Sequence, residues 1–202
     1  MMEKPDVFQT LKAPSEAMYK VKGSKHYGYV FPISSVDEVK AHLDALRKKH
    51  HGARHHAYAY RLGPDGANWR TSDDGEPANS AGPPILGAMK SKEVTQCLGV
   101  VVRYFGGTKL GVGGLIDAYK TATAMALEAG DLIERFVEDE FVVQCPYDLL
   151  GTVLSLSDKF GARVVEQTFT HECQVQLAVR TSVAPALLDA LHQVYGCFVV
   201  DL

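Results

Sequence analysis

The chain has 202 residues, of which 46% are apolar, and its formal net charge is −3. This apolar share is enough to bury a core in one or two domains. No stretch approaches the roughly 18 apolar residues that a membrane helix requires, and the first residues lack the basic-then-apolar pattern of a secretion signal. We therefore expect a cytoplasmic protein without a membrane segment.

The charge is divided unevenly along the chain. Residues up to Arg135 hold 18 Lys/Arg against 15 Asp/Glu, whereas the remainder hold 3 against 9. An anionic partner such as RNA or phosphate is therefore expected to contact the first half. The four cysteines are widely spaced and show no metal-ligand spacing. We expect buried free thiols, and neither a metal nor a cofactor.

The first half mixes strands and helices. Tyr27, Tyr29 and Phe31 alternate with other residues as in a strand, and Ser35 with Glu38 forms a capping box for a helix that runs to about Lys49. A second alternating strand contains His56, Tyr58, Tyr60 and Leu62, which places His55 and Arg61 on its opposite face.

A buried strand and a close-packed helix complete this half. Leu98 to Phe105 is a nearly continuous apolar run, typical of a central strand. From Leu115 to Ala129, alanines recur at every fourth position and form a smooth stripe that packs closely on a sheet. We expect an α+β domain over residues 1–135.

A different pattern begins after residue 135. Strand and helix signals alternate in the order βαββαβ, and Gly161 and Gly196 stand where the two helices should end. This is the ferredoxin-like order, which predicts a second domain over residues 136–202. The expected elements are residues 139–145, 147–160, 162–170, 173–180, 184–195 and 197–202.

Three segments of the first domain could carry chemistry, and the first is glycine-rich. Between Phe105 and Leu115, five glycines and Lys109 separate the buried strand from the following helix. Gly107, Gly111 and Gly113, with Lys109, could cradle an anion at a helix N-terminus, although no nucleotide-binding fingerprint is present. The alternative is a purely structural loop.

The second segment is cationic. Arg54 and His55 open one strand, Lys25 lies in an earlier strand, and Arg103 lies in the buried one. Adjacent strand residues face opposite ways, so His55 and His56 cannot share a metal ion without other ligands. The alternatives are a cationic binding face, or one core and one surface histidine.

The third segment, Ser72 to Leu86, contains Asp73, Asp74 and Glu76. Three carboxylates in four residues could bind Mg²⁺ or act as acid and base. The alternative is a set of Asx turns, followed by a helix with proline in its first turn and Ser80 near its cap. Trp69 precedes this segment in what reads as a polar loop.

Together these three segments resemble the IMPACT/YigZ family. The SDDGEP string at residues 72–77, the AGPP string at 81–84 and the VVRYFGG string at 101–107 carry the resemblance. It implies an N-terminal domain similar to the second domain of a small-subunit ribosomal protein, and a ferredoxin-like domain similar to those of elongation factor G. Where bacterial relatives usually show Ser-Arg-Phe, this chain has Ser24-Lys25-His26, which loses an aromatic ring.

The family resemblance implies a role in translation control and brings no catalytic residues. The leading hypothesis is a regulatory protein that binds RNA or a ribosome-associated partner through its first domain, and another is an interaction module whose second domain binds a protein. The candidate contacts of the first domain are Lys25, Arg54, His55, Arg103, Gly107, Lys109, Gly111 and Gly113. Arg103 could instead form a structural ion pair with Asp73 or Asp74. The rival hypothesis is an enzyme acting on a phosphate-bearing or peptide-like small molecule, with the glycine loop as anion site and Asp73, Asp74 or Glu76 as metal ligand or base.

Overall fold

A computed structural model describes residues 6–201, which fall into two compact units divided between Arg135 and Phe136. Both units mix helices and strands, as the α+β prediction requires. Within the described part of the chain, no helix is long and apolar enough to cross a membrane. All four cysteines are free thiols, and Cys97, Cys145 and Cys173 are buried.

The N-terminal unit is built on a five-stranded antiparallel sheet with the strand order β2-β3-β6-β4-β5. The central strand is β6, whose residues Cys97 to Arg103 are all buried, which confirms the strand predicted from the apolar run. The strands are β2 (Ser15–Val21), β3 (Ser24–Pro32), β4 (His55–Leu62), β5 (Asn68–Ser72) and β6 (Cys97–Tyr104). A separate two-stranded sheet pairs β1 (Val7–Leu11) with β7 (Leu132–Phe136).

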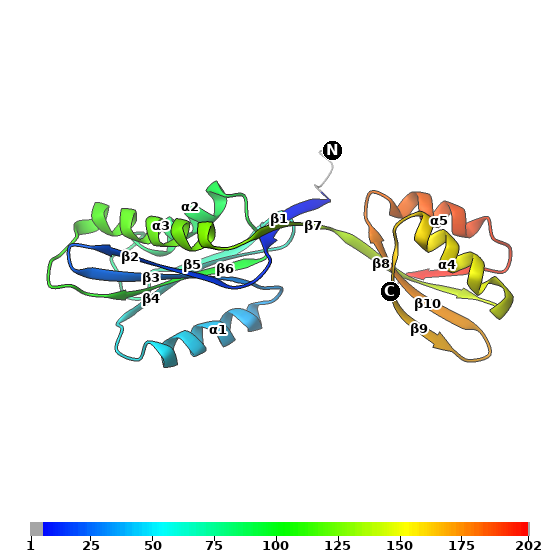
Figure 1. Cartoon of the computed structure of the whole chain (residues 1–202), viewed down its shortest axis with the longest axis horizontal. Coiled ribbons are helices and arrows are strands. Elements are labelled where there is room, and N and C mark those ends of the chain that lie inside the picture. Colours follow the sequence, from blue (N-terminus) through cyan, green and yellow to red (C-terminus); the bar gives the residue numbers. More distant parts are fainter. Residues whose placement is uncertain (1–5, 202) are drawn as a thin grey trace. The chain divides into compact units, whose positions relative to one another are not determined.

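Helices cover both faces of the five-stranded sheet. Figure 1 shows α1 (Val36–Lys49) on one face, and α2 (Gly82–Ser91) and α3 (Gly111–Ala129) on the other. The strand alternation sorts the core accordingly: Tyr29, Tyr60 and Val100 pack with α1, whereas Ala57, Ala59 and Val101 pack with α2 and α3. Ser35 caps α1 by accepting a hydrogen bond from the Glu38 amide, as predicted.

Helix α3 lies unusually close to the sheet. A Cβ atom at Gly28 would stand 2.3 Å from the carbonyl oxygen of Ala122, so β3 and α3 touch backbone to backbone here. Ala118, Ala122 and Ala126 are fully buried, as the alanine stripe predicted. The helix begins at Gly111 rather than Leu115, although glycine has a low helix propensity and the first residue of α3 buried against the sheet is Leu115.

This contact gives a test of the fold. We expect Gly28→Ala to lower the free energy of unfolding by about 3 kcal/mol, since neither backbone can yield without shifting the helix. In contrast, Gly87→Ala in α2 meets no atom within 4 Å. It should be neutral, or stabilise by about 0.5–1 kcal/mol. Urea unfolding followed by the fluorescence of Trp69 would measure both, and equal effects would contradict this packing.

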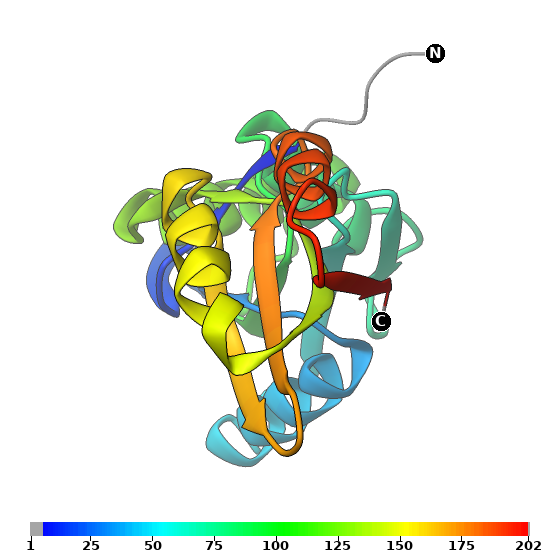
Figure 2. The ribbon, with the colours of Figure 1, turned by 90° about the vertical axis from the view of Figure 1, so that its right-hand side faces the viewer.

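The C-terminal unit has the element order βαββαβ and the strand order β11-β8-β10-β9, which is the predicted ferredoxin-like arrangement. Figure 2 shows the two helices on one face of this sheet. Phe141, Val143, Val175 and Leu177 form the core beneath them. The elements are β8 (Glu138–Cys145), a short 3-10 helix (Tyr147–Leu149), α4 (Leu150–Lys159), β9 (Arg163–Phe169), β10 (Cys173–Arg180), α5 (Ala184–His192) and β11 (Phe198–Asp201).

Candidate functional site

The three motif segments meet at one end of the five-stranded sheet. Arg103 on β6 lies between His26 on β3 and His55 on β4, its register partners in the two neighbouring strands. Directly opposed residues of antiparallel strands project to the same face. The three side chains therefore form a row beneath α3 and the Ser72–Ser80 loop.

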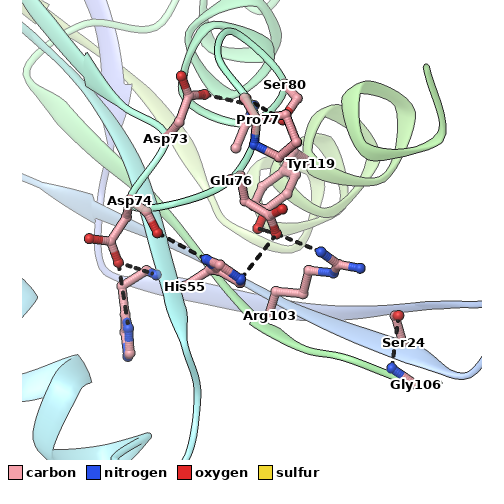
Figure 3. A network of polar contacts seen from close by, with 12 residues as sticks. Ser24, His55, Asp73, Asp74, Glu76, Pro77, Ser80, Arg103, Gly106 and Tyr119 are labelled. Carbon is pink, nitrogen blue, oxygen red and sulfur yellow. Dashed lines mark hydrogen bonds and ion pairs between the residues drawn. The ribbon is translucent and has the colours of Figure 1, made fainter. Parts of the chain in front are cut away.

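Glu76 from that loop neutralises the centre of the row. Its Oε1 atom accepts hydrogen bonds from Arg103 Nη1 at 2.7 Å and from the Tyr119 hydroxyl of α3 at 2.8 Å (Figure 3). The side chains of Arg103 and Glu76 are only 8% and 3% exposed, so this is a buried ion pair. Burial and the charge of Glu76 raise the pKa of Tyr119, which therefore keeps its proton. Arg103 does form a structural ion pair, but its partner is Glu76 rather than Asp73 or Asp74.

The two aspartates point away from Glu76 and hold the loop in place. Asp73 accepts from the amides of Asn79, Ala81 and Gly82, so it caps α2 from outside the helix. Asp74 accepts from the amide of His56, and its carbonyl accepts from His55 Nδ1 at 2.9 Å. Ser80 lies next to the N-cap residue Ala81, near the cap as predicted, but its hydroxyl donates to the Pro77 carbonyl and does not cap the helix. Among residues 6–201, no cluster of His, Cys, Asp or Glu is arranged to hold a metal ion.

His26 is a buried histidine at the edge of this network. It is 0% exposed and packs edge-on against Tyr119, with ring centroids 5.4 Å apart. Neither ring nitrogen has a hydrogen-bond partner of good geometry. A weak contact with the Tyr19 backbone raises the pKa of His26 only slightly. Burial, together with the positive charge of Arg103, lowers the pKa of His26 to about 4. The ring is therefore neutral at pH 7.

Two adjoining pockets open at this end of the sheet. The arginine pocket, of about 390 Å³, is lined by Gly52, Arg54, His55, Arg103, Tyr104 and Phe105. The tyrosine pocket, of about 630 Å³, is lined by Glu16, Gly23, Lys25, Tyr27, Tyr29, Lys49, His50, Tyr104 and Phe105. Tyr104 and Phe105 line both pockets, so the two adjoin, and we refer to the pair together as the groove. Neither pocket is lined by Asp73, Asp74 or Glu76.

The structure thus brings part of the predicted site together. Lys25, Arg54, His55 and Arg103 line the groove, whereas Lys109 is exposed on the loop that follows Phe105 and lines neither pocket. Lys49, His50, Tyr104 and Phe105 also line the groove, and the sequence did not predict them. The one available signal was the aromatic pair Tyr104-Phe105 where the apolar run meets the glycine-rich loop; in the structure Phe105 is 60% exposed.

The glycines serve different purposes. A Cβ atom at Gly106 would stand 1.9 Å from the carbonyl carbon of Gly23, so this glycine lets the loop approach the β2–β3 turn. Gly107 has φ +93° and Gly111 has φ +74°, and both are in open surroundings. Gly111 and Gly113 belong to the first turn of α3, not to the loop. Trp69, predicted in a loop, lies in β5 with Lys90 Nζ 5.0 Å from its ring centroid.

Both units of the chain match known protein domains. The model of the Impact N-terminal domain matches residues 22–127, and a domain of unknown function, DUF1949, matches residues 143–195. A protein of Haemophilus influenzae named IMPACT family member is 32% identical, over 86% of this chain and 85% of its own. The chain belongs to the IMPACT family.

A second relative and two solved structures are also similar to this chain. The IMPACT family member YigZ of Escherichia coli is 31% identical over 78% of both chains. The crystal structure of a hypothetical protein matches 98% of both chains at 26% identity with a TM-score of 0.75. The structure of the two-domain translational regulator Yih1 matches 60% of this chain and 47% of its own, with a TM-score of 0.34. That score is too low to support a structural comparison.

Proposed function

We propose that this IMPACT family protein regulates translation by binding single-stranded RNA through its N-terminal unit. The observation that carries the proposal is that Tyr104 and Phe105 lie between two adjoining pockets, one lined by Lys25 and Lys49 and the other by Arg54 and Arg103. Proteins that bind single-stranded nucleic acid combine cations along the backbone path with aromatic rings on which bases stack.

The cations of the groove are not equally available to a phosphate. Arg103 is offset by Glu76, and Lys49 pairs with Glu16 at 3.2 Å. Lys25 and Arg54 are exposed and make no ion pair within the described residues. Attraction for the RNA backbone therefore comes mainly from these two side chains.

Phe105 offers the stacking surface. Its ring is 60% exposed, and the guanidinium carbon of Arg103 lies 5.7 Å from the ring centroid. A base stacked on this ring would gain about 1–3 kcal/mol. The adjoining loop carries Gly107 and Lys109, and the first turn of α3, with Gly111 and Gly113, contains no acidic residue and no side-chain cap. The border of the groove is therefore favourable to a phosphate.

The setting we propose is the cytoplasm, with the ribosome or a translation-control protein as further partner. The family resemblance implies this setting, because the domains it likens to a ribosomal protein and to elongation factor G both work on the ribosome. The enzyme alternative receives less support. It requires carboxylates in the same cleft as the anion site, whereas Asp73 and Asp74 accept backbone hydrogen bonds and Glu76 is paired with Arg103.

Binding of a labelled single-stranded RNA, followed by fluorescence anisotropy across a salt series, tests the proposal. We expect micromolar or tighter binding at low salt. Lys25→Glu and Arg54→Glu should each weaken it by about tenfold or more and reduce its salt dependence. Lys120→Glu makes the same charge change on an exposed position of α3 outside the groove and should bind like the wild type. Absence of binding at low salt, or an equal loss in the control variant, would contradict the proposal.

A further inference from the structure

A chain of hydrogen bonds runs beneath the tyrosine pocket. The Tyr29 hydroxyl lies 2.8 Å from His50 Nε2, and His50 Nδ1 lies 3.0 Å from the Tyr104 hydroxyl. His50, just after the end of α1, is 8% exposed and Tyr29 is 5% exposed, whereas Tyr104 is only half-buried. All three side chains line the tyrosine pocket, and Tyr104, the most exposed of them, also lines the arginine pocket.

The ring of His50 is neutral. Burial lowers its pKa, and the positive charge of neighbouring Lys49 lowers it further. A neutral imidazole has one N–H donor and one acceptor nitrogen. One tyrosine must therefore donate to His50, and the other must accept from it.

The surroundings of Tyr29 decide the direction. Lys49 Nζ lies 4.8 Å from the Tyr29 ring centroid and can only donate, and burial raises the Tyr29 pKa, so the hydroxyl keeps its proton. If His50 donated to Tyr29, the Tyr29 proton would have no protein acceptor within the described residues in a side chain only 5% exposed, whereas the half-buried Tyr104 can donate outward. Tyr29 therefore donates to Nε2, and His50 donates from Nδ1 to the Tyr104 oxygen.

This direction leaves the hydroxyl hydrogen of Tyr104 unused. Within the described residues, His50 is the one hydrogen-bond partner of that hydroxyl. Tyr104 lines both pockets, Lys25 is its register partner on β3, and Arg54 lines the arginine pocket with it. A polarised O–H donor thus shares one pocket with each of the two cations that carry no ion pair within the described residues.

We propose that Lys25, Tyr104 and Arg54 form a binding site for one phosphodiester of the RNA, in which the Tyr104 hydroxyl donates the orienting hydrogen bond to a phosphate oxygen. The inference rests on the proposed function and specifies its contact. The two cations attract any phosphate, whereas the hydroxyl hydrogen fixes where one phosphate oxygen sits. The buried chain from Tyr29 through His50 keeps that donor directed away from the protein.

Two measurements on the full chain test this inference. The first is the ¹⁵N NMR spectrum of the His50 imidazole without RNA, which should show a protonated Nδ1 and an unprotonated Nε2. The second is the affinity of Tyr104→Phe for the labelled single-stranded RNA. The variant should bind about tenfold more weakly with the wild-type salt dependence, because it loses a neutral donor. Lys25→Met should instead make the RNA affinity less dependent on salt, by the contribution that one phosphate contact makes to the slope of log affinity against log salt concentration.

Tyr58→Phe is the matched control, since Tyr58 is a half-buried tyrosine of the same sheet face that lines neither pocket. It should bind RNA like the wild type. Protonation of His50 at Nε2, or unchanged affinity in Tyr104→Phe while Lys25→Glu and Arg54→Glu lose binding, would overturn the inference and leave the proposed function standing. Failure of the wild type to bind RNA would overturn both.

Discussion

Replacing Arg103 by methionine should lower the free energy of unfolding by about 3–5 kcal/mol, because it leaves the Glu76 carboxylate buried without its cation. Glu76 is 3% exposed, and its remaining donor at short distance is the Tyr119 hydroxyl. His55 Nε2 is 3.9 Å away, too far for a strong hydrogen bond. Trp69, the one tryptophan, lies in β5, so its fluorescence during urea unfolding reports on this unit.

A double variant separates the buried charge from lost packing. With Glu76→Gln added, no charge is buried, and the amide oxygen can still accept from Tyr119. Arg103→Met with Glu76→Gln should therefore recover more than half of the loss seen in Arg103→Met alone. If the double variant is as unstable as the sum of the two single variants, the Glu76–Arg103 ion pair is not what the network depends on.

His26→Phe should make the free energy of unfolding depend less on pH on the acid side of neutrality. In the unfolded chain His26 takes up a proton near its ordinary pKa of 6.5, whereas in the folded protein it does so at about 4. The unfolded state therefore binds more protons between these values. The stability from the neutral ring is complete above pH 6.5 and is lost as the pH falls toward 4, by about 3 kcal/mol in total.

The comparison with wild type isolates this histidine, since burial also lowers the pKa of His50 and of His56, and both remain in the variant. Phenylalanine is larger than histidine, so the absolute stability can change through packing. The difference between the two proteins should nevertheless shift in favour of the variant as the pH falls. Parallel curves from pH 7 to the acid limit of the folded wild type would show that His26 is not buried neutral.

Local sequence patterns were sufficient to predict those elements whose structure is determined by residues close together in the sequence. The apolar run of β6 and the Ser35 cap of α1 depend on neighbours in the chain, and both were predicted correctly. The start of α3 was not, because the glycines at 111, 113 and 114 have a low helix propensity and gave no helix signal before Leu115.

The contacts that form the site could not be predicted from one sequence. Which acid pairs with Arg103 is decided by the path of the Ser72–Ser80 loop, where Asp73 turns to α2 and Asp74 to β4, leaving Glu76 for the arginine. The groove depends on the register that sets Lys25 beside Tyr104, and on the end of α1, which supplies His50. These contacts join residues far apart in the sequence.

The most direct test of the account is to map the RNA-binding surface by amide NMR while the full chain is titrated with an unlabelled single-stranded RNA. We expect the amide chemical shifts to change around Lys25, Arg54, Tyr104 and Phe105, and to stay unchanged in β5 and in the C-terminal unit. Changes confined to the C-terminal unit, or spread evenly over exposed cations such as Lys120, would contradict a specific RNA groove in the N-terminal unit.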